Sequence, residues 1–386
     1  MGQQMTILTA EDLLGRLVGY PTVVGHANLN LIQFIADYLE SYGAQVHVLT
    51  GPEGDRANLF ATIGDPSVPG YILSGHVDVV PAGEPEWKGD PFKMRRDGDR
   101  LIGRGACDMK GFDAAVLAAV PDLAALSLSA PVHIALSYDE EAGCKGVPHM
   151  IAELPNLCAR PLGCIVGEPT GLQPVLAHKG KAALRLRAKG LAGHSSRPDQ
   201  GQNAIHALLP ALSAAAAQAE ALKTQSQDAR FAPSYSTLQI GVVQGGQAVN
   251  IIPDHAEALI ETRAIAGVDP RQLMAPIIAQ AGSSLEVDWV SSYPALALPT
   301  ESDLSRLMSE LSGKPPLGAV SFGTEAGLFQ QAGIPSIICG PGDISRAHKP
   351  EEYLTRAELE ATRDMICKLG QHLANKLRSI LCCKHS

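Results

Sequence analysis

Short apolar runs alternate with amphipathic segments through most of the chain, and this pattern predicts an α/β protein. Four of the runs read as buried strands, and an acidic residue or a histidine follows each one directly or after a short loop. The runs are Tyr71–Leu73, Val132–Ser137, Leu162–Val166 and Ile334–Cys339. Because alternating strands and helices favour parallel pairing, we expect a mostly parallel sheet that gathers these polar residues along one edge.

Helices are predicted where apolar residues recur on one face. Thr9 is a suitable N-cap, and Asp12 stands at the capping-box position, so a first helix begins there. Apolar periodicity predicts further helices over about 28–42, 111–126 and 356–378. The helix at 111–126 is apolar on most sides, which predicts that it is buried.

The middle of the chain has a different pattern. Leu184 and Leu186 alternate with two arginines, which is typical of a strand with one exposed face. The elements predicted there are a strand at 183–188, a helix at 203–224, strands at 236–243 and 256–263, a helix at 270–281 and a strand at 285–291. This βαββαβ order matches a ferredoxin-like unit. We therefore expect a catalytic α/β domain formed by residues 1–178 and 293–386, split by an inserted α+β domain at 179–292.

Composition narrows the class of protein. The 386 residues carry a net charge of −9 and no basic cluster, which argues against a nucleic-acid partner. No apolar stretch reaches about 18 residues, so we expect no membrane span. Met1–Ala10 lacks the basic and long apolar regions of a secretion leader. The eight cysteines show no CxxC spacing and fit reduced thiols, so we expect a cytoplasmic protein.

The polar residues at the strand ends suggest metal binding, although each has an ordinary alternative. His76 and Asp78 are two residues apart and point the same way, so His76 can bind a metal while Asp78 accepts its other ring N–H. A polar loop would look the same. Asp108 precedes a predicted helix and could equally be its N-cap. Glu140 and Glu141 face different directions, so one can bind a metal and the other a water; a solvated acidic turn is the alternative.

Glu168 and His348 complete the set, although each alone would read as a surface loop residue. Carboxylates crowded at one sheet edge repel one another unless a cation lies among them. A mixed set of imidazole and carboxylate ligands suits zinc, with cobalt or manganese as alternatives, and the number of ligands predicts two divalent ions. The absence of a CxxC pair and of a His-Glu-x-x-His motif argues against structural zinc or a single-zinc protease.

Several segments together resemble the co-catalytic metallohydrolases. They are SGHVDVVP at 74–81, GRGACDMKG at 103–111, DEE at 139–141 and GEPT at 167–170. That family holds acetylornithine deacetylases, succinyl-diaminopimelate desuccinylases, aminoacylases and carboxypeptidases of the G type, and the resemblance runs from about Leu13 to Arg378. Within it, the segments AHKGK at 177–181, GTEAG at 323–327 and CGPG at 339–342, which leads to AHKPEEY at 347–353, are most similar to the acetylornithine deacetylase branch.

The resemblance implies a role for each strand-end residue. Asp108 would bridge two metal ions and precede a cis peptide bond to Met109. His76 and Glu168 would complete one metal site, and Glu141 and His348 the other. The remaining two residues are catalytic in the family, with Glu140 as the general base and Asp78 as the partner of His76.

The resemblance also implies a homodimer whose inserted domain pairs two subunits. His194 would then reach the active site of the partner subunit, and Asn250 and Arg263 would bind the carboxylate of a substrate. The implied reaction, a step of arginine biosynthesis, is hydrolysis of the acetyl amide of N2-acetyl-L-ornithine, a small N-acyl amino acid. Related alternatives are an aminoacylase, a desuccinylase or a dipeptidase, and a further alternative is a non-catalytic metal-dependent binder.

Recognition of a cationic substrate side chain calls for a carboxylate near the pocket. We expect Glu325 to contact the δ-ammonium, directly or through water; the alternative is that Glu325 only supports the glycine-rich loop at 323–327. The α-carboxylate of such a substrate needs a cationic partner, and Lys179 or Arg263 could provide it.

Overall fold

The computed structural model describes residues 7–282 and 285–383, with side chains up to residue 375 apart from 283–284. Met1–Thr6, part of the segment compared with a leader, lie outside the described residues, and so do the side chains of Cys382 and Cys383. The chain forms two compact units. Unit 1 comprises the residues up to Leu176, Leu298–Gly318 and the residues from Thr324 onward, and unit 2 comprises Ala177–Ala297 and Ala319–Gly323. The insert predicted from the sequence covers 179–292.

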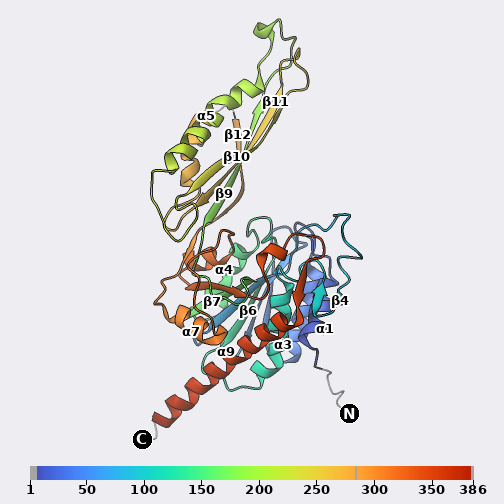
Figure 1. Ribbon diagram of the computed structural model, residues 1–386, viewed down its shortest axis with the longest axis vertical. Coiled ribbons are helices and arrows are strands. Elements are labelled where there is room, and N and C mark those ends of the chain that lie inside the picture. The colour runs from blue at the N-terminus through green and yellow to red at the C-terminus, as the bar shows by residue number, and fades with distance from the viewer. Residues whose placement is uncertain (1–6, 283–284, 384–386) are drawn as a thin grey trace. The chain divides into compact units, whose positions relative to one another are not determined.

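Unit 1 is built on a six-stranded sheet flanked by helices (Figure 1). Its strands are β1 (Gln45–Thr50), β2 (Ala57–Ile63), β3 (Tyr71–His76), β6 (Val132–Ser137), β7 (Gly163–Pro169) and β14 (Ser336–Gly340). A second, three-stranded sheet contains β4 (Arg95–Asp97), β5 (Arg100–Ile102) and β15 (Tyr353–Thr355). The helices of unit 1 are α1 (Ala10–Val18), α2 (Leu29–Ser41), α3 (Lys110–Ala124), α4 (Val147–Leu157), α7 (Asp303–Ser312), α8 (Ala326–Gln331) and α9 (Arg356–Cys383).

The strand order β1-β2-β6-β3-β7-β14 explains why polar residues gather at one edge. Strands β6, β3, β7 and β14 pair in parallel, while β1, β2 and β6 pair in antiparallel fashion. The mostly parallel sheet predicted from the sequence is therefore confirmed, with an antiparallel edge. Parallel strands end at the same side of a sheet, so His76, Ser137, Pro169 and Gly340 mark one common edge.

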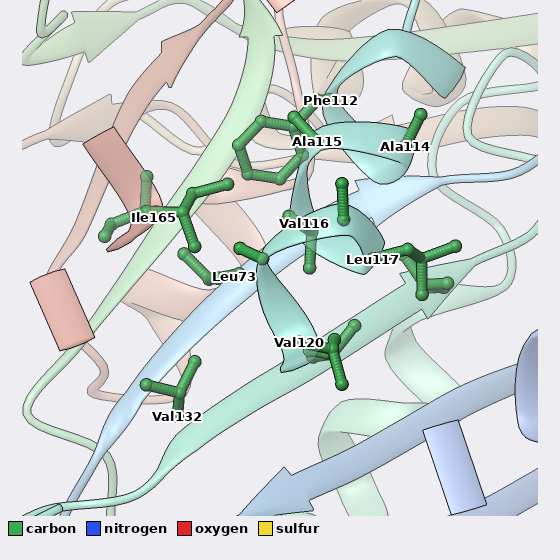
Figure 2. Packing of buried hydrophobic residues seen from close by; sticks show 14 of the residues in the cluster. Leu73, Phe112, Ala114, Ala115, Val116, Leu117, Val120, Val132 and Ile165 are labelled. Carbon is green, nitrogen blue, oxygen red and sulfur yellow. The ribbon is translucent and has the colours of Figure 1, made fainter. Parts of the chain in front are cut away.

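Helix α3 packs against the centre of this sheet, and Figure 2 shows its Phe112, Val116 and Val120 beside strand residues such as Leu73. Two neighbours on β3 show which helices cover which face. Ser74 bonds to Glu325 at the start of α8, whereas a side chain at Gly75 would collide with Asp113 on α3. Successive strand residues point to opposite faces, so α3 and α8 lie on opposite faces of the sheet.

Unit 2 contains a four-stranded sheet, in the order β10-β11-β9-β12. Its main elements are β9 (Gly180–Lys189), α5 (Ala204–Leu222), β10 (Thr237–Gly245), β11 (His255–Ala264), α6 (Ala275–Ala281) and β12 (Leu285–Tyr293), and a short pair joins β8 (Ala177–His178) to β13 (Leu296–Ala297). The predicted alternation on β9 is present: Leu184 and Leu186 are buried, and the arginines between are not. Helix α5 lies along one face of the sheet (Figure 1).

Several elements were not predicted from the sequence. Helix α4 contains Pro148 in its first turn and Pro155 near its end, and these prolines obscured its apolar face. Helix α7 begins at the N-cap Ser302 and ends at Gly313, which has a positive φ, and these ordinary start and stop signals were missed. No helix among the described residues is long and apolar enough to cross a membrane.

Candidate metal centre

Five of the strand-end residues converge in two groups of three that share one member. His76, Asp108 and Glu168 form one group, and Asp108, Glu141 and His348 form the other. In each group the candidate ligand atoms all lie within 4.8 Å of one another. All five residues belong to unit 1, and they come from β3, β7, the turn before α3, and the loops after β6 and β14.

The ring of His76 is fixed by the backbone of the same loop. Its Nδ1 lies 2.9 Å from the carbonyl oxygen of Asp78, and since a carbonyl only accepts, Nδ1 must carry the proton. Nε2 is then free to bind a metal, and it lies 3.1 Å from Oδ1 of Asp108. The carboxylate of Asp78 lies beside the same ring nitrogen, with Oδ1 at 3.6 Å from Nδ1, and its role as the partner of His76 stays a prediction.

The carboxylate of Asp78 also holds the acidic turn after β6. Its Oδ1 accepts the backbone N–H of Glu140 and its Oδ2 that of Glu141, each at 3.1 Å. The turn is further fixed by Asp139, which has a φ of 52° and accepts a hydrogen bond from the backbone N–H of Gly25. Backbone strain of this kind is tolerated where the surrounding bonds determine the conformation, often at functional sites.

Asp108 stands between the two groups. It is not the N-cap of α3, because Met109 takes that position without a side-chain capping bond. Its two carboxylate oxygens point to different histidines: Oδ1 toward His76, and Oδ2 toward Nε2 of His348 at 3.3 Å. The Asp108–Met109 peptide bond is cis, as the resemblance implied.

The second group is more open than the first. Nε2 of His348 lies 2.9 Å from Oε1 of Glu141, and the His348 side chain is 49% exposed. His348 has a φ of 58°, a left-handed conformation that is uncommon for a residue with a Cβ atom. This conformation belongs to the loop after β14 that aims the ring at Asp108 and Glu141.

Glu140 lies beside both groups but belongs to neither. The thiol of Cys144 donates to Oε1 of Glu140 at 3.2 Å, a contact that sequence reasoning missed. Burial raises the pKa of Glu140 to about 8, and the charges of Glu141 and Asp78 act in the same direction. A carboxyl group that is not a ligand and has a raised pKa can take up and return a proton near neutral pH.

The electrostatics of the centre fit bound cations. Burial and the charge of Asp108 raise the pKa of Glu168 well above its ordinary value, and the same causes raise that of Glu141. Hydrogen bonds to Asp108 and Glu141 raise the pKa of His348 to about 10. The negative charge of the carboxylates therefore exceeds the nearby positive charge, and protonated imidazoles would balance it only in part. The donor set of imidazoles and carboxylates fits two divalent ions, with Asp108 shared.

Glu325 is bonded to two serines of the six-stranded sheet. The side chain is 1% exposed, and its oxygens accept from the hydroxyls of Ser74, at 2.5 Å, and Ser137, at 2.7 Å. These bonds fit the supporting role, and contact with a substrate ammonium, directly or through water, stays a prediction. Glu325 ties the start of α8 to strands β3 and β6. Two serines at neighbouring strand ends were the only signal, and serine is too common there to predict the contact.

Lys179 makes contacts within unit 2, and its assignment to a substrate carboxylate stays a prediction. Its ammonium donates to the carbonyl oxygens of Pro233 and Tyr235, at 2.9 and 2.6 Å, and lies 5.5 Å from the ring centre of Phe231. Lys179 is 6% exposed, and burial lowers its pKa. It anchors the 231–235 loop of unit 2.

The other substrate candidates are also in unit 2 and are more accessible. Arg263, on β11, is half-buried and donates from Nε to Glu261 at 2.8 Å. His194 and Asn250 are exposed, and the backbone carbonyl of Asn250 accepts from the N–H of Ser195. Nδ1 of His194 accepts the backbone N–H of Ser196 at 3.2 Å, so its neutral ring carries the proton on Nε2. That proton can be donated to a negatively charged oxygen.

Comparison with known proteins identifies the family. The model of peptidase family M20/M25/M40 matches residues 72–372. An acetylornithine deacetylase from Proteus mirabilis is 32% identical and covers 95% of this chain and 96% of its own length. A metallo-carboxypeptidase of the M20 family from Sulfolobus solfataricus superposes with a TM-score of 0.75 at 20% identity, covering 94% of this chain and 98% of that one. A dinuclear metal-binding peptidase of the same family from Bacillus subtilis gives 0.60 at 18% identity, covering 94% and 96%. The chain therefore belongs to peptidase family M20/M25/M40.

Proposed function

We propose that this protein is a metal-dependent amidohydrolase that cleaves the acetyl amide of N2-acetyl-L-ornithine to L-ornithine and acetate, a step of arginine biosynthesis. The observation that carries the proposal is the pair of ligand groups that share Asp108. The substrate is supported by curated relatives named acetylornithine deacetylase at 31–32% identity over nearly the whole chain.

The five converging residues would hold two divalent ions, zinc first and cobalt as the alternative. His76 and Glu168 would bind one ion and Glu141 and His348 the other, with one oxygen of Asp108 toward each. Ions held there would supply positive charge that polarises the amide carbonyl and lowers the pKa of an attacking water. The mixed imidazole and carboxylate set supports zinc, because each group contains an imidazole nitrogen, a ligand that suits zinc better than magnesium or calcium.

Glu140 would act as the general base and then as the general acid. Its carboxylate takes a proton from the attacking water while the oxygen of that water bonds to the acetyl carbon. The same proton then passes from Glu140 to the amine nitrogen as the C–N bond breaks, so the carboxylate is regenerated. Asp78 holds the backbone N–H of Glu140, and Cys144 donates to its side chain, which orients the base.

Unit 2 would provide dimer contacts and substrate binding. We assign the domains as 1–178 and 293–386 for catalysis and 179–292 for dimerisation and closure. The exposed Nε2–H of His194 would reach the partner subunit's active site and stabilise the developing oxyanion. Asn250 and Arg263 would bind the substrate α-carboxylate. The exposed position of His194 and Asn250 supports a role toward another molecule rather than within unit 2.

A second candidate function is a broader N-acyl-amino-acid hydrolase. The observation that favours it is the burial of Glu325. We expected its carboxylate to select a cationic side chain, but its two oxygens accept hydrogen bonds from Ser74 and Ser137. A cytoplasmic location suits either function. The six described free cysteines support it, because an oxidising compartment favours disulfides.

A substrate comparison separates the two functions. The protein is stripped of metal with a chelator, reloaded with zinc or cobalt, and assayed with N-acetylornithine, N-acetylmethionine and N-succinyl-diaminopimelate. Acetylornithine deacetylation predicts a kcat/KM at least about 10-fold higher for the first substrate, which corresponds to about 1.4 kcal/mol of transition-state binding. Equal or higher values for N-acetylmethionine would favour the broader hydrolase, and no amide cleavage with any ion would contradict both.

A further inference from the structure

A buried ion pair lies among the loops that carry the metal-ligand candidates. Arg104 and Glu352 are each 1% exposed, and Nη1 of Arg104 donates to Oε2 of Glu352 at 2.8 Å. Burying two charges costs more free energy than their attraction usually returns, so such a pair is weak support for a stabilising role. The hydrogen bonds that the two side chains make beyond their own pair indicate a different role.

Glu352 holds the backbone of the bridging aspartate. Its Oε1 accepts the N–H of Cys107 at 2.9 Å and the N–H of Asp108 at 3.0 Å. These two bonds fix the turn from which the Asp108 side chain projects, with one oxygen toward His76 and the other toward His348. Carboxylate bonds to backbone N–H groups are stronger than neutral ones, so the turn is held firmly.

Arg104 links this turn to two other loops. Nη1 also lies 3.3 Å from the carbonyl oxygen of Lys349, the residue after His348. Nη2 donates to the carbonyl oxygen of Pro81 and to Oε1 of Glu84, both at 3.1 Å, in the loop that continues from His76 and Asp78. The guanidinium also lies 5.2 Å from the ring centre of Trp87. One planar side chain therefore joins the loops of His76, Asp108 and His348.

We propose that Arg104 and Glu352 are positioning residues that set the geometry of both metal sites without touching either ion. The inference rests on the two-metal centre of the proposed function. It has a consequence that separates it from a stabilising role. Because Asp108 is shared, loosening its turn must weaken both metal sites together, whereas loss of Glu168 or of Glu141 would weaken mainly one.

The test is a titration of the metal-free protein with cobalt(II). Calorimetry measures the two affinities, and the visible absorption of the bound ion reports the geometry of its ligands. In Glu352→Gln the amide oxygen can keep the bonds to Cys107 and Asp108, but its NH2 group meets the donor of Arg104. We expect both cobalt affinities to fall by about 10- to 100-fold, the usual effect of residues that orient metal ligands. The absorption bands should change shape as well.

The matched control is Glu351→Gln, the same substitution one residue earlier. Glu351 bonds to Arg95 and to the backbone N–H of Lys88, and neither residue belongs to the two ligand groups. This variant should bind both ions as the unchanged protein does. If this variant weakened both sites as much as Glu352→Gln, any loss of charge in this loop would weaken metal binding, and the inference would be wrong.

Arg104→Lys provides a second test if Glu352→Gln does not fold. Lysine keeps the charge but has only three donors on one nitrogen, so it cannot make all four bonds of the guanidinium, which go to Glu352, Lys349, Pro81 and Glu84, and both affinities should again fall. Folded variants whose two cobalt affinities stay within about 3-fold of the unchanged protein would overturn the inference, because that change is smaller than the usual effect of residues that orient metal ligands. A loss of affinity confined to one site would overturn it as well. Failure of the unchanged protein to bind two ions would instead contradict the proposed function.

Discussion

The loops around Asp108 and the loops around His194 differ in their burial and in the hydrogen bonds that fix them within their own unit. Asp108 is 5% exposed, its carboxylate oxygens face two histidines, and its backbone is bound by Glu352. His194 and Asn250 are exposed, and the His194 ring bonds to its neighbour Ser196. The first region is organised by unit 1 alone, so its chemistry follows from its geometry. Among the described residues, the second region has no such contacts of its own, and its proposed role depends on a ligand or a second chain.

The largest predicted effect is on the shared aspartate. Asp108→Asn keeps the shape of the side chain but removes the charge that both ligand groups share. We expect both metal affinities to fall by more than about 100-fold, beyond the usual effect of residues that only orient ligands, and turnover to fall to background. Calorimetry with cobalt measures the first result and amide hydrolysis the second. Retention of one tight site would break the comparison, because the centre would not then depend on one bridging residue.

His194→Ala should produce a smaller loss of turnover and no loss of metal. The ring is exposed in unit 2 and belongs to neither ligand group, so two ions should bind with unchanged affinity. If Nε2–H stabilises the oxyanion, kcat should fall by about 100- to 1,000-fold. Mixing the variant with a Glu140→Gln variant checks the role across subunits. Recovery of activity in the mixed dimer supports it, and no recovery in a mixture shown to contain mixed dimers contradicts it.

Glu325→Gln should affect all substrates alike. The carboxylate is bonded to Ser74 and Ser137 and is not accessible, so the change weakens a structural contact by about 1–3 kcal/mol without altering selectivity. The ratio of kcat/KM for N-acetylornithine over N-acetylmethionine should therefore stay constant. A ratio that falls more than about 10-fold would return Glu325 to the substrate site and correspond to a lost contact of about 1.4 kcal/mol.

The smallest effect is predicted for Asp113, a buried acid on α3 that lies against Gly75 of β3, and it concerns stability. Burial raises the pKa of Asp113 to about 8, and neither of its oxygens has a hydrogen-bond partner among the described residues. The folded chain therefore favours the neutral acid, and stability present below about pH 4 is lost as the pH rises toward about 8. Asp113→Asn removes this loss. In metal-free protein its urea midpoint should match the unchanged protein near pH 4 and exceed it near pH 8; equal midpoints at both pH values would contradict the assignment.

The same difference between regions explains what could be predicted from sequence. The convergence of His76, Glu168 and Glu141 follows from parallel strands that end at one edge, a rule that needs only the strand assignments. The partners of Glu325 and Lys179 could not be predicted, because each lies in a segment far along the chain with no local signal. Glu352 follows Pro350 and Glu351 and reads as a solvated turn, although it is buried against Arg104.

The strand and helix pattern of unit 2 was predictable for a related reason. Alternation of Leu184 and Leu186 with arginines, followed by an alanine-rich helix, indicates a sheet with one covered face, and unit 2 has that sheet. The exact loops that face substrate depend on contacts with other molecules. Neither propensity nor periodicity records such contacts, so Arg263, Asn250 and His194 remain predictions.

In the proposed mechanism, unit 1 holds two ions independently of the residue that moves the proton. The most direct test is Glu140→Gln, measured for cobalt stoichiometry by calorimetry and for turnover of N-acetylornithine by ornithine release. Because Glu140 belongs to neither ligand group, we predict two bound ions and a kcat lower by about 100- to 10,000-fold. Normal turnover with two ions bound would contradict the role of Glu140, and loss of an ion would contradict the division between ligands and base.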